Sequence, residues 1–241
     1  MTDAAFIPLG DSASPQVLAE EKDFLVVYKP PRMHSTPLPG SAQADTLAGW
    51  CAARFPETAD LGGRRAGEGG LLHRLDYETQ GLLLVARTQT GMESLLEQQR
   101  AGKIAKEYTA LAQAATARLP GFSLQRPEGM RIQSAFRPYG PGRKAVRPVP
   151  EGEQYLTEIL HSRPAAGGLT SFRIRIVRGF RHQIRCHLAW LGMPIVNDSL
   201  YGAGPFGSGL LGLRACSLLF ADPASGTERG FLIPPIECWG I

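Results

Sequence analysis

The chain has 241 residues, enough to bury a large core in one domain or in one domain with a small appendage. Hydrophobic residues make up 43% of it and charged residues 20%, ordinary values for a globular protein, and the formal net charge is +4. Because no stretch approaches the roughly 18 uninterrupted apolar residues of a membrane span, and the N-terminus lacks the pattern of a secretory signal, we expect a cytoplasmic protein with no membrane partner.

The first half of the chain reads as strands and helices separated by loops. Residues 1–22 show little periodicity and are expected to form an N-terminal extension. The stretch "DFLVVYKP" is typical of a short strand ended by two prolines. The stretch "ADTLAGWCAARFP" has helical spacing, with Asp45 or Thr46 as the N-cap and Pro56 as the stop. Further expected elements are a strand at residues 82–86, a helix at residues 90–104 that breaks at Gly102, and a strand at residues 105–114.

The second half is expected to be richer in strands. Residues 117–149 carry many prolines and glycines and predict loops around short strands. Two strands are expected at residues 155–163 and 169–179, followed by a helix at residues 182–192, and the remaining tail is expected to be poor in strands. Since strands follow one another rather than alternating with helices, the sequence predicts an α+β fold, a mainly antiparallel mixed sheet with flanking helices and loops.

Basic residues concentrate in two segments that contain no acid. Residues 129–149 carry five arginines or lysines, and residues 169–197 carry five arginines. Such segments in a nearly balanced chain predict one positively charged face that binds an anionic partner. The alternative is an ordinary solvated surface.

A polar group precedes the apolar strand expected at residues 82–86. His73, Arg74 and Asp76 lie within four positions in the stretch "LLHRLDYETQGLLLVA". A carboxylate held where a loop meets a buried strand can act as a nucleophile or a general base, and a neighbouring cation keeps it ionised. The alternative is a structural role for Asp76, as a helix cap or in an ion pair.

Two other stretches carry candidate functional residues. Tyr108, on an expected strand, could stack on a planar base or transfer a proton, although a lone strand tyrosine is more often core. Arg181, His182 and Arg185 fall in the first turns of the expected helix at residues 182–192, where donors suit phosphates; Arg185 could instead reach inward and pair with a carboxylate.

The sequence contains no pattern that predicts a metal site or a redox site. The four cysteines are far apart with no CxxC pair, which indicates a reducing compartment and neither a zinc knuckle nor a redox pair. Cys186 is expected to be a small buried hydrophobic residue. His182 and His187 are out of phase for one helical face and lack metal-binding partners, so no metal site is expected.

Taken together, these motifs resemble a known family. The stretches "HRLDYETQGLLLVA", "KEYTALAQ" and "GFRHQIRCHLAWLGMPIVNDSLYG" resemble, in that order, signature stretches of the RluA family of pseudouridine synthases. The segments "DFLVVYKPPRMHSTP" and "GLRACSLLFADPASGTERGF" are similar to the family's opening and closing segments. The resemblance runs from about residue 24 to residue 231 and implies that residues 23–241 form a pseudouridine synthase catalytic domain. Only about 20 residues precede it, too few for an RNA-binding module of the S4 type.

The resemblance also implies an activity and roles for individual residues. It implies an isomerase that converts uridine to pseudouridine in ribosomal or transfer RNA, without metal or organic cofactor. Asp76 matches the catalytic aspartate, Tyr108 the tyrosine that stacks on the base, and Arg185 the cation that pairs with the aspartate. Arg74 matches the residue that fills the gap left by the flipped nucleotide, because the target base must leave its stack. The remaining expected RNA-binding residues are His73, Arg181 and His182.

The sequence departs from the family pattern in two places and leaves alternatives open. Residues 79–81 read TQG where the family usually has TSG, and residues 179–183 read GFRHQ where it usually has GRTHQ. A silent RNA-binding or assembly factor with the same fold, or a hydrolase that uses Asp76, remain alternatives. The joint presence of Asp76, Tyr108 and Arg185 favours the isomerase, which we expect to be a monomer.

Overall fold

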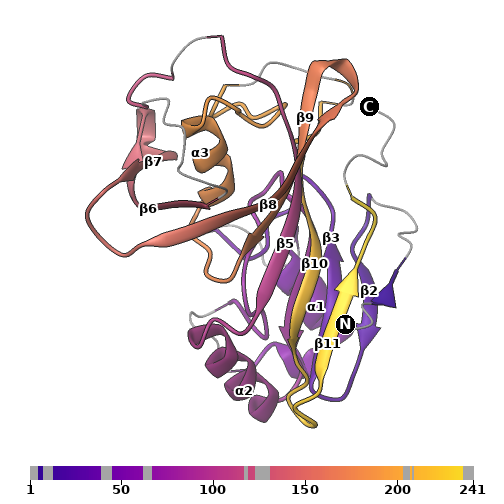
Figure 1. The fold of residues 1–241 in the computed structure, drawn as a ribbon. Coiled ribbons are helices and arrows are strands. Elements are labelled where there is room, and N and C mark those ends of the chain that lie inside the picture. Colours follow the sequence, from indigo (N-terminus) through magenta and orange to yellow (C-terminus); the bar gives the residue numbers. More distant parts are fainter. Residues whose placement is uncertain are drawn as a thin grey trace. The chain divides into compact units, whose positions relative to one another are not determined.

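The computed structural model describes residues 5–7, 13–38, 45–61, 67–116, 119–122, 131–202, 207 and 209–235. The chain divides into two compact units (Figure 1). The first unit combines Met1–Lys106 with Ala215–Pro234, and the second combines Glu107–Arg214 with Pro235–Ile241. The second unit is therefore largely an insertion in the sequence of the first.

The first unit is a twisted sheet with two helices. Its elements are β1 (Ala5–Phe6), β2 (Gln16–Glu20), β3 (Phe24–Lys29), α1 (Leu47–Arg54), β4 (Gln80–Ala86), α2 (Gln89–Arg100) and β10 (Leu213–Ala221), which starts in the second unit, with β11 (Glu228–Leu232). The strand order is β2–β3–β4–β10, and β11 also pairs with β10. The β3–β4 and β10–β11 pairs are antiparallel, whereas β1 runs parallel to β11.

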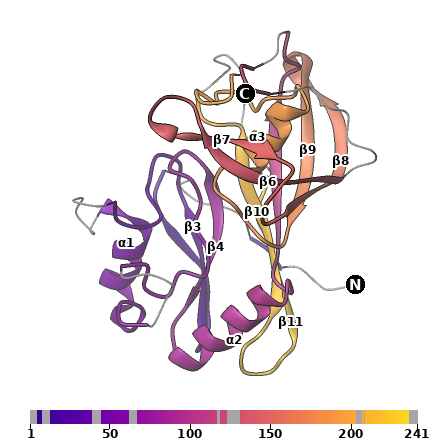
Figure 2. The same cartoon turned by 90° about the vertical axis from the view of Figure 1, so that its left-hand side faces the viewer.

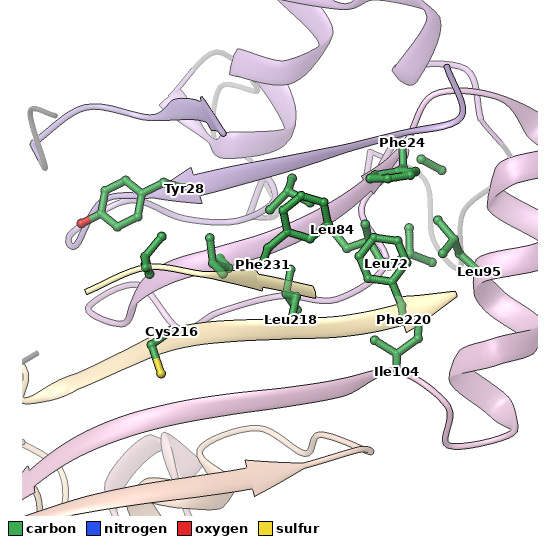
Figure 3. Close-up of a cluster of buried hydrophobic side chains, with 14 of the residues drawn as sticks. Phe24, Tyr28, Leu72, Leu84, Leu95, Ile104, Cys216, Leu218, Phe220 and Phe231 are labelled. Atoms are coloured by element: carbon green, nitrogen blue, oxygen red, sulfur yellow. The ribbon is translucent and has the colours of Figure 1, made fainter. Parts of the chain in front are cut away.

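The core of the first unit explains why its central strands are so apolar. Every residue of β3 and β4 is buried, as expected for strands covered on both faces. Side chains from these strands pack with those of α2, β10 and β11 (Figure 3). The members of this cluster labelled in Figure 3 are Phe24, Tyr28, Leu72, Leu84, Leu95, Ile104, Cys216, Leu218, Phe220 and Phe231.

The second unit contains a long hairpin, a short hairpin and one helix. Its elements are β5 (Ala105–Ala112), which starts in the first unit, β6 (Arg131–Tyr139), β7 (Ala145–Val149), β8 (Tyr155–Ala165), β9 (Leu169–Ile176) and α3 (Gln183–Trp190). The strand order is β5–β9–β8–β6–β7. The β8–β9 hairpin is the longest antiparallel pair of the unit, and β7 lies beside α3 (Figure 2).

The α+β fold, with a mainly antiparallel mixed sheet, is confirmed. The helix expected after residue 45 is α1, and the Thr46 side chain caps it by accepting a hydrogen bond from the Gly49 amide. One expectation was wrong, because the tail contains β10 and β11. Residues 1–22 contain β1 and β2, which pair with β11 and β3. None of the described helices is long and apolar enough to cross a membrane.

Candidate active site

The residues expected to act on the substrate are divided between the two units. His73, Arg74 and Asp76 belong to the first unit, in the loop that precedes β4. Tyr108 and Arg185 belong to the second unit, on β5 and α3.

The backbone is anchored on both sides of Asp76. The Ser35 hydroxyl donates a hydrogen bond to the Leu75 carbonyl at 2.8 Å and accepts one from the Leu75 amide at 3.0 Å. The Tyr77 carbonyl accepts a hydrogen bond from the Met33 amide at 3.2 Å. Since Asp76 lies between these two anchors and is only half-buried, its carboxylate is presented from a fixed loop.

Lys29 strengthens this anchoring and was not identified from the sequence. Its side chain is fully buried, and its ammonium donates hydrogen bonds to the carbonyls of Pro30, Met33 and Tyr77 at 2.8, 2.8 and 3.3 Å. Burial lowers the pKa of Lys29 to about 7, and the charge of Asp76 partly offsets that effect. The available signal was a lysine at the end of an apolar strand, directly before two prolines.

Ionisation of Lys29 should make the stability of the protein depend on pH. With a folded-state pKa of about 7, below its ordinary value of 10.5, Lys29 binds fewer protons in the folded state than in the unfolded state between these limits. Its contribution to the free energy of unfolding is therefore constant below about pH 7 and rises above it, by up to ~1.4 kcal/mol per pH unit. Denaturant unfolding between neutral and alkaline pH should show this rise in wild type and lose it in Lys29→Met; equal slopes would exclude a depressed pKa.

The side chain of Arg74 is accessible to solvent in the loop that precedes β4. Its side chain is 51% exposed, and its guanidinium lies 3.5 Å from the Glu68 carboxylate. Only the Arg74 end of this ion pair is exposed, because the Glu68 side chain is buried. His73 is half-buried in the same loop.

Gln80, the departure in the TQG stretch, is a buried hydrogen-bonding residue. The Tyr28 hydroxyl donates to the Gln80 side-chain oxygen at 2.8 Å, and Tyr28 lies at one end of the core cluster with its hydroxyl directed away from it (Figure 3). Gly81 follows with φ of +127°, and a Cβ there would lie 2.2 Å from the Ala215 carbonyl oxygen. Glycine is therefore required at position 81, because the backbone of Ala215 approaches too closely for a side chain. Gln80 instead joins β4 to β3 through the hydrogen bond of its side chain.

Tyr28→Phe should destabilise the protein by about 1–3 kcal/mol, because the buried Gln80 oxygen loses this donor. The matched control is Tyr77→Phe, which removes a hydroxyl from a residue that is 45% exposed and should change stability by less than about 0.5 kcal/mol. Denaturant unfolding measures both variants. An equal, small effect of the two substitutions would show that the Tyr28–Gln80 bond contributes nothing.

In the second unit, Arg185 reaches inward and pairs with a carboxylate. Its guanidinium binds both oxygens of Asp198 in a fork, with Nε–Oδ2 and Nη2–Oδ1 distances of 2.7 and 2.8 Å. Asp198 is fully buried and also accepts hydrogen bonds from the amides of Leu200 and Tyr201. Asp198 could not be singled out from the sequence, because an aspartate between asparagine and serine is typical of a turn.

Arg181 and His182, at the start of α3, have different surroundings. The exposed Arg181 guanidinium donates to the carbonyls of Arg143 and Ala145 at 3.1 and 3.4 Å. His182 is half-buried in the left-handed conformation, with φ of +57°, and its ring meets Tyr201 edge-on. Arg181 is thus the more accessible of these two expected RNA-binding residues.

Tyr108 is buried on β5, and a cluster of charged side chains lies on the opposite face of this strand. Its neighbour Glu107 accepts hydrogen bonds from Arg173 at 2.8 Å and from Arg175 at 2.6 Å. Since successive strand residues point to opposite faces, Tyr108 points away from these arginines. Burial of Tyr108 is compatible with both a core role and a covered site.

His187 is a buried core residue. Its two ring nitrogens lie 2.9 Å from the Ser134 hydroxyl and 2.8 Å from the Thr157 hydroxyl, and burial lowers its pKa to about 3. Cys186 is buried as expected. Among the residues that the structure describes, no three His, Cys, Asp or Glu side chains gather where they could hold a metal ion.

Comparison with known proteins identifies a family over most of the chain. Residues 23–190 match the family model described as RNA pseudouridylate synthase. An uncharacterized RNA pseudouridine synthase of Chloroflexus aurantiacus is 34% identical over 86% of this chain and 61% of the relative. The ribosomal large subunit pseudouridine synthase D of Xanthomonas campestris is 33% identical over 77% of this chain and 51% of the relative. The chain thus spans between half and two thirds of the length of these relatives.

Solved structures with the same fold carry corresponding names. The human RNA pseudouridylate synthase domain containing 1 aligns with a TM-score of 0.61 and 23% identity, over 94% of this chain and 85% of that protein. The human RNA pseudouridylate synthase domain containing 4 aligns with a TM-score of 0.60 and 19% identity, over 91% and 88% of the two chains. These similarities confirm the fold that the motifs implied.

Proposed function

Because the chain belongs to the RNA pseudouridylate synthase family, we propose that it isomerises uridine to pseudouridine in RNA, with Asp76 as its catalytic group. The observation that carries this proposal is the anchored loop, in which Leu75 and Tyr77 are both held by hydrogen bonds while the Asp76 side chain stays half-buried. A preorganised carboxylate of this kind suits attack on, or electrostatic assistance at, a reacting sugar or base.

The reaction breaks the bond between uracil N1 and the ribose anomeric carbon and forms a bond from that carbon to uracil C5. The proton on C5 is released to solvent and N1 takes up a proton, so the reaction is an isomerisation with no change of oxidation state. We therefore propose that no cofactor takes part. Tyr108 would stack on the flipped base, Arg185 would support the aspartate, and Arg74, whose side chain is exposed, would fill the vacated position.

Ribosomal RNA is the substrate class that we propose first. The support is the name of relatives such as the synthase D of Xanthomonas campestris, which refers to the large ribosomal subunit. Transfer RNA is the second class, and its support is the resemblance to the RluA family. We further propose that the protein acts as a cytoplasmic monomer.

The direct test uses the purified full chain and cellular RNA that carries tritium at uracil C5. Release of tritium to solvent, with new pseudouridines mapped in the same RNA, is the expected result. Mapping ribosomal and transfer RNA separately assigns the substrate class. If the protein binds the RNA and releases no tritium, it is a silent RNA-binding protein and the proposed activity is wrong.

A further inference from the structure

The β6–β7 hairpin of the second unit carries four exposed cationic side chains. Arg137 and Arg147 face each other in the register of the two strands, and Arg143 and Lys144 lie at the turn between them. We call these four residues the hairpin cations. Like charges directly opposite each other across two strands are destabilising, so the fold by itself does not favour this arrangement.

The hairpin cations differ from the other basic residues of the unit. Arg173 and Arg175 on β9 share the Glu107 carboxylate, and Arg178 pairs with Glu153. By contrast, none of the hairpin cations has an ion-pair partner among the residues that the structure describes; Arg147 lies over the Tyr139 ring instead. Of the two acid-free segments in the sequence, one is therefore largely neutralised by distant acids, and the hairpin remains positive.

The hairpin is held in place rather than extended freely. Val146 is buried against α3, where its carbonyl accepts a hydrogen bond from the Cys186 thiol, and its amide donates to the Tyr201 hydroxyl at 2.8 Å. At the turn, Arg181 binds the carbonyls of Arg143 and Ala145 and adds a fifth positive charge. The fold thus fixes a cluster of cations that a flexible loop would separate.

One alternative role concerns the edge of the sheet. β7 stands at the end of the strand order of this unit, and charged residues on an outer strand prevent pairing with other chains. That role needs only a charge on β7 itself. It gives no reason for Arg137 on β6, for the cations of the turn, or for the contact that Arg181 makes with the turn.

We propose that the hairpin cations bind the sugar-phosphate backbone of the RNA substrate. This inference rests on the proposed function, because that function supplies the polyanion. Guanidinium and ammonium groups are donors only and match phosphate oxygens, so the hairpin positions the RNA without reading its sequence. Binding of phosphates would also relieve the repulsion between Arg137 and Arg147.

The test is the salt dependence of RNA binding by the full chain with Arg143, Lys144 and Arg147 all replaced by serine. With a short oligouridylate as the probe, each phosphate contact contributes about 0.7 to the slope of log Kd against log salt concentration. The slope should therefore fall by about 2 in the variant, measured between about 50 and 200 mM KCl. An unchanged slope overturns the proposal.

Two controls separate a local effect from a loss of net charge or of folding. Replacing Lys22, Arg100 and Lys103 by serine removes the same charge from exposed positions of the first unit and should leave the slope unchanged. The variant with Arg143→Lys and Arg147→Lys keeps the charge and should keep the slope. An equal fall in the first-unit variant would mean that net charge alone governs binding, and the proposal would fail. Circular dichroism confirms that each variant is folded.

Tritium release by the wild-type protein separates this inference from the proposed function. If wild type releases tritium and the hairpin variant keeps the wild-type slope, the activity stands and the hairpin proposal is wrong. If wild type releases no tritium while the variant loses slope, the hairpin binds RNA and the proposed activity is wrong. If the hairpin variant aggregates and its soluble fraction has the wild-type slope, the hairpin cations protect the sheet edge and the proposal is wrong.

Discussion

Replacement of Asp76 by asparagine is expected to lower tritium release from uridine-labelled RNA by at least about 10³-fold, because an amide can neither attack the sugar nor supply the negative charge. The fold should survive. Asp76 is half-buried, and the contacts that hold the loop use the backbone of Leu75 and Tyr77 rather than its side chain. The pKa of Lys29 should fall in this variant, since the charge of Asp76 raises it in wild type.

A matched control lies two residues away in the same loop. Glu78→Gln removes a half-buried carboxylate and should leave tritium release close to wild type. Thermal unfolding shows whether both variants are folded. If Asp76→Asn releases tritium at the wild-type rate, Asp76 takes no part in the mechanism. If Glu78→Gln loses as much tritium release as Asp76→Asn, the loss of any charge from this loop abolishes the activity.

Arg185→Met is expected to destabilise the protein by about 3–5 kcal/mol, because it leaves the Asp198 carboxylate buried without its charge partner. For a chain of this size, the melting temperature should fall by on the order of 10 °C. Stability is the quantity to measure here, because Arg185 is also expected to support turnover. A loss of unfolding free energy smaller than about 1 kcal/mol in Arg185→Met would mean that the buried pair contributes little to stability.

The double variant Arg185→Met with Asp198→Asn tests the coupling between the two groups. Asparagine removes the lone charge and keeps an oxygen that can accept from the amides of Leu200 and Tyr201. The double variant should therefore be more stable than Arg185→Met alone. Additive losses from the two single variants would show that Arg185 and Asp198 act independently.

Local patterns predicted most elements of the fold correctly. The apolar runs of β3 and β4, the Thr46 cap of α1 and the alternation of apolar and basic residues along β9 each indicate one structure within a few residues. β10 and β11 were missed because proline and glycine between and after them suggested irregular structure. Their strand character depends on pairing with each other and with β4, which no local pattern contains.

Charge partners were the least predictable part of the site. Local composition suggested that both acid-free segments were equally positive, yet Glu107 neutralises Arg173 from a position 66 residues away. Asp198 and Lys29 were missed for related reasons, since their roles depend on groups brought to them by the fold. The loop around Asp76 could be anticipated, because a polar group directly before an apolar strand is a local feature of the sequence.

The order of the two units along the chain affects the order in which they can fold. The core of the first unit includes Leu218, Phe220 and Phe231, and β10 pairs with β4, so the first unit needs residues that follow the second unit in the sequence. Residues 107–214 emerge from the ribosome before those strands do, and domains tend to fold as units while they emerge. The first unit, which contains the Asp76 loop, therefore cannot finish folding until residues 107–214 have been synthesised and β10 and β11 have followed them.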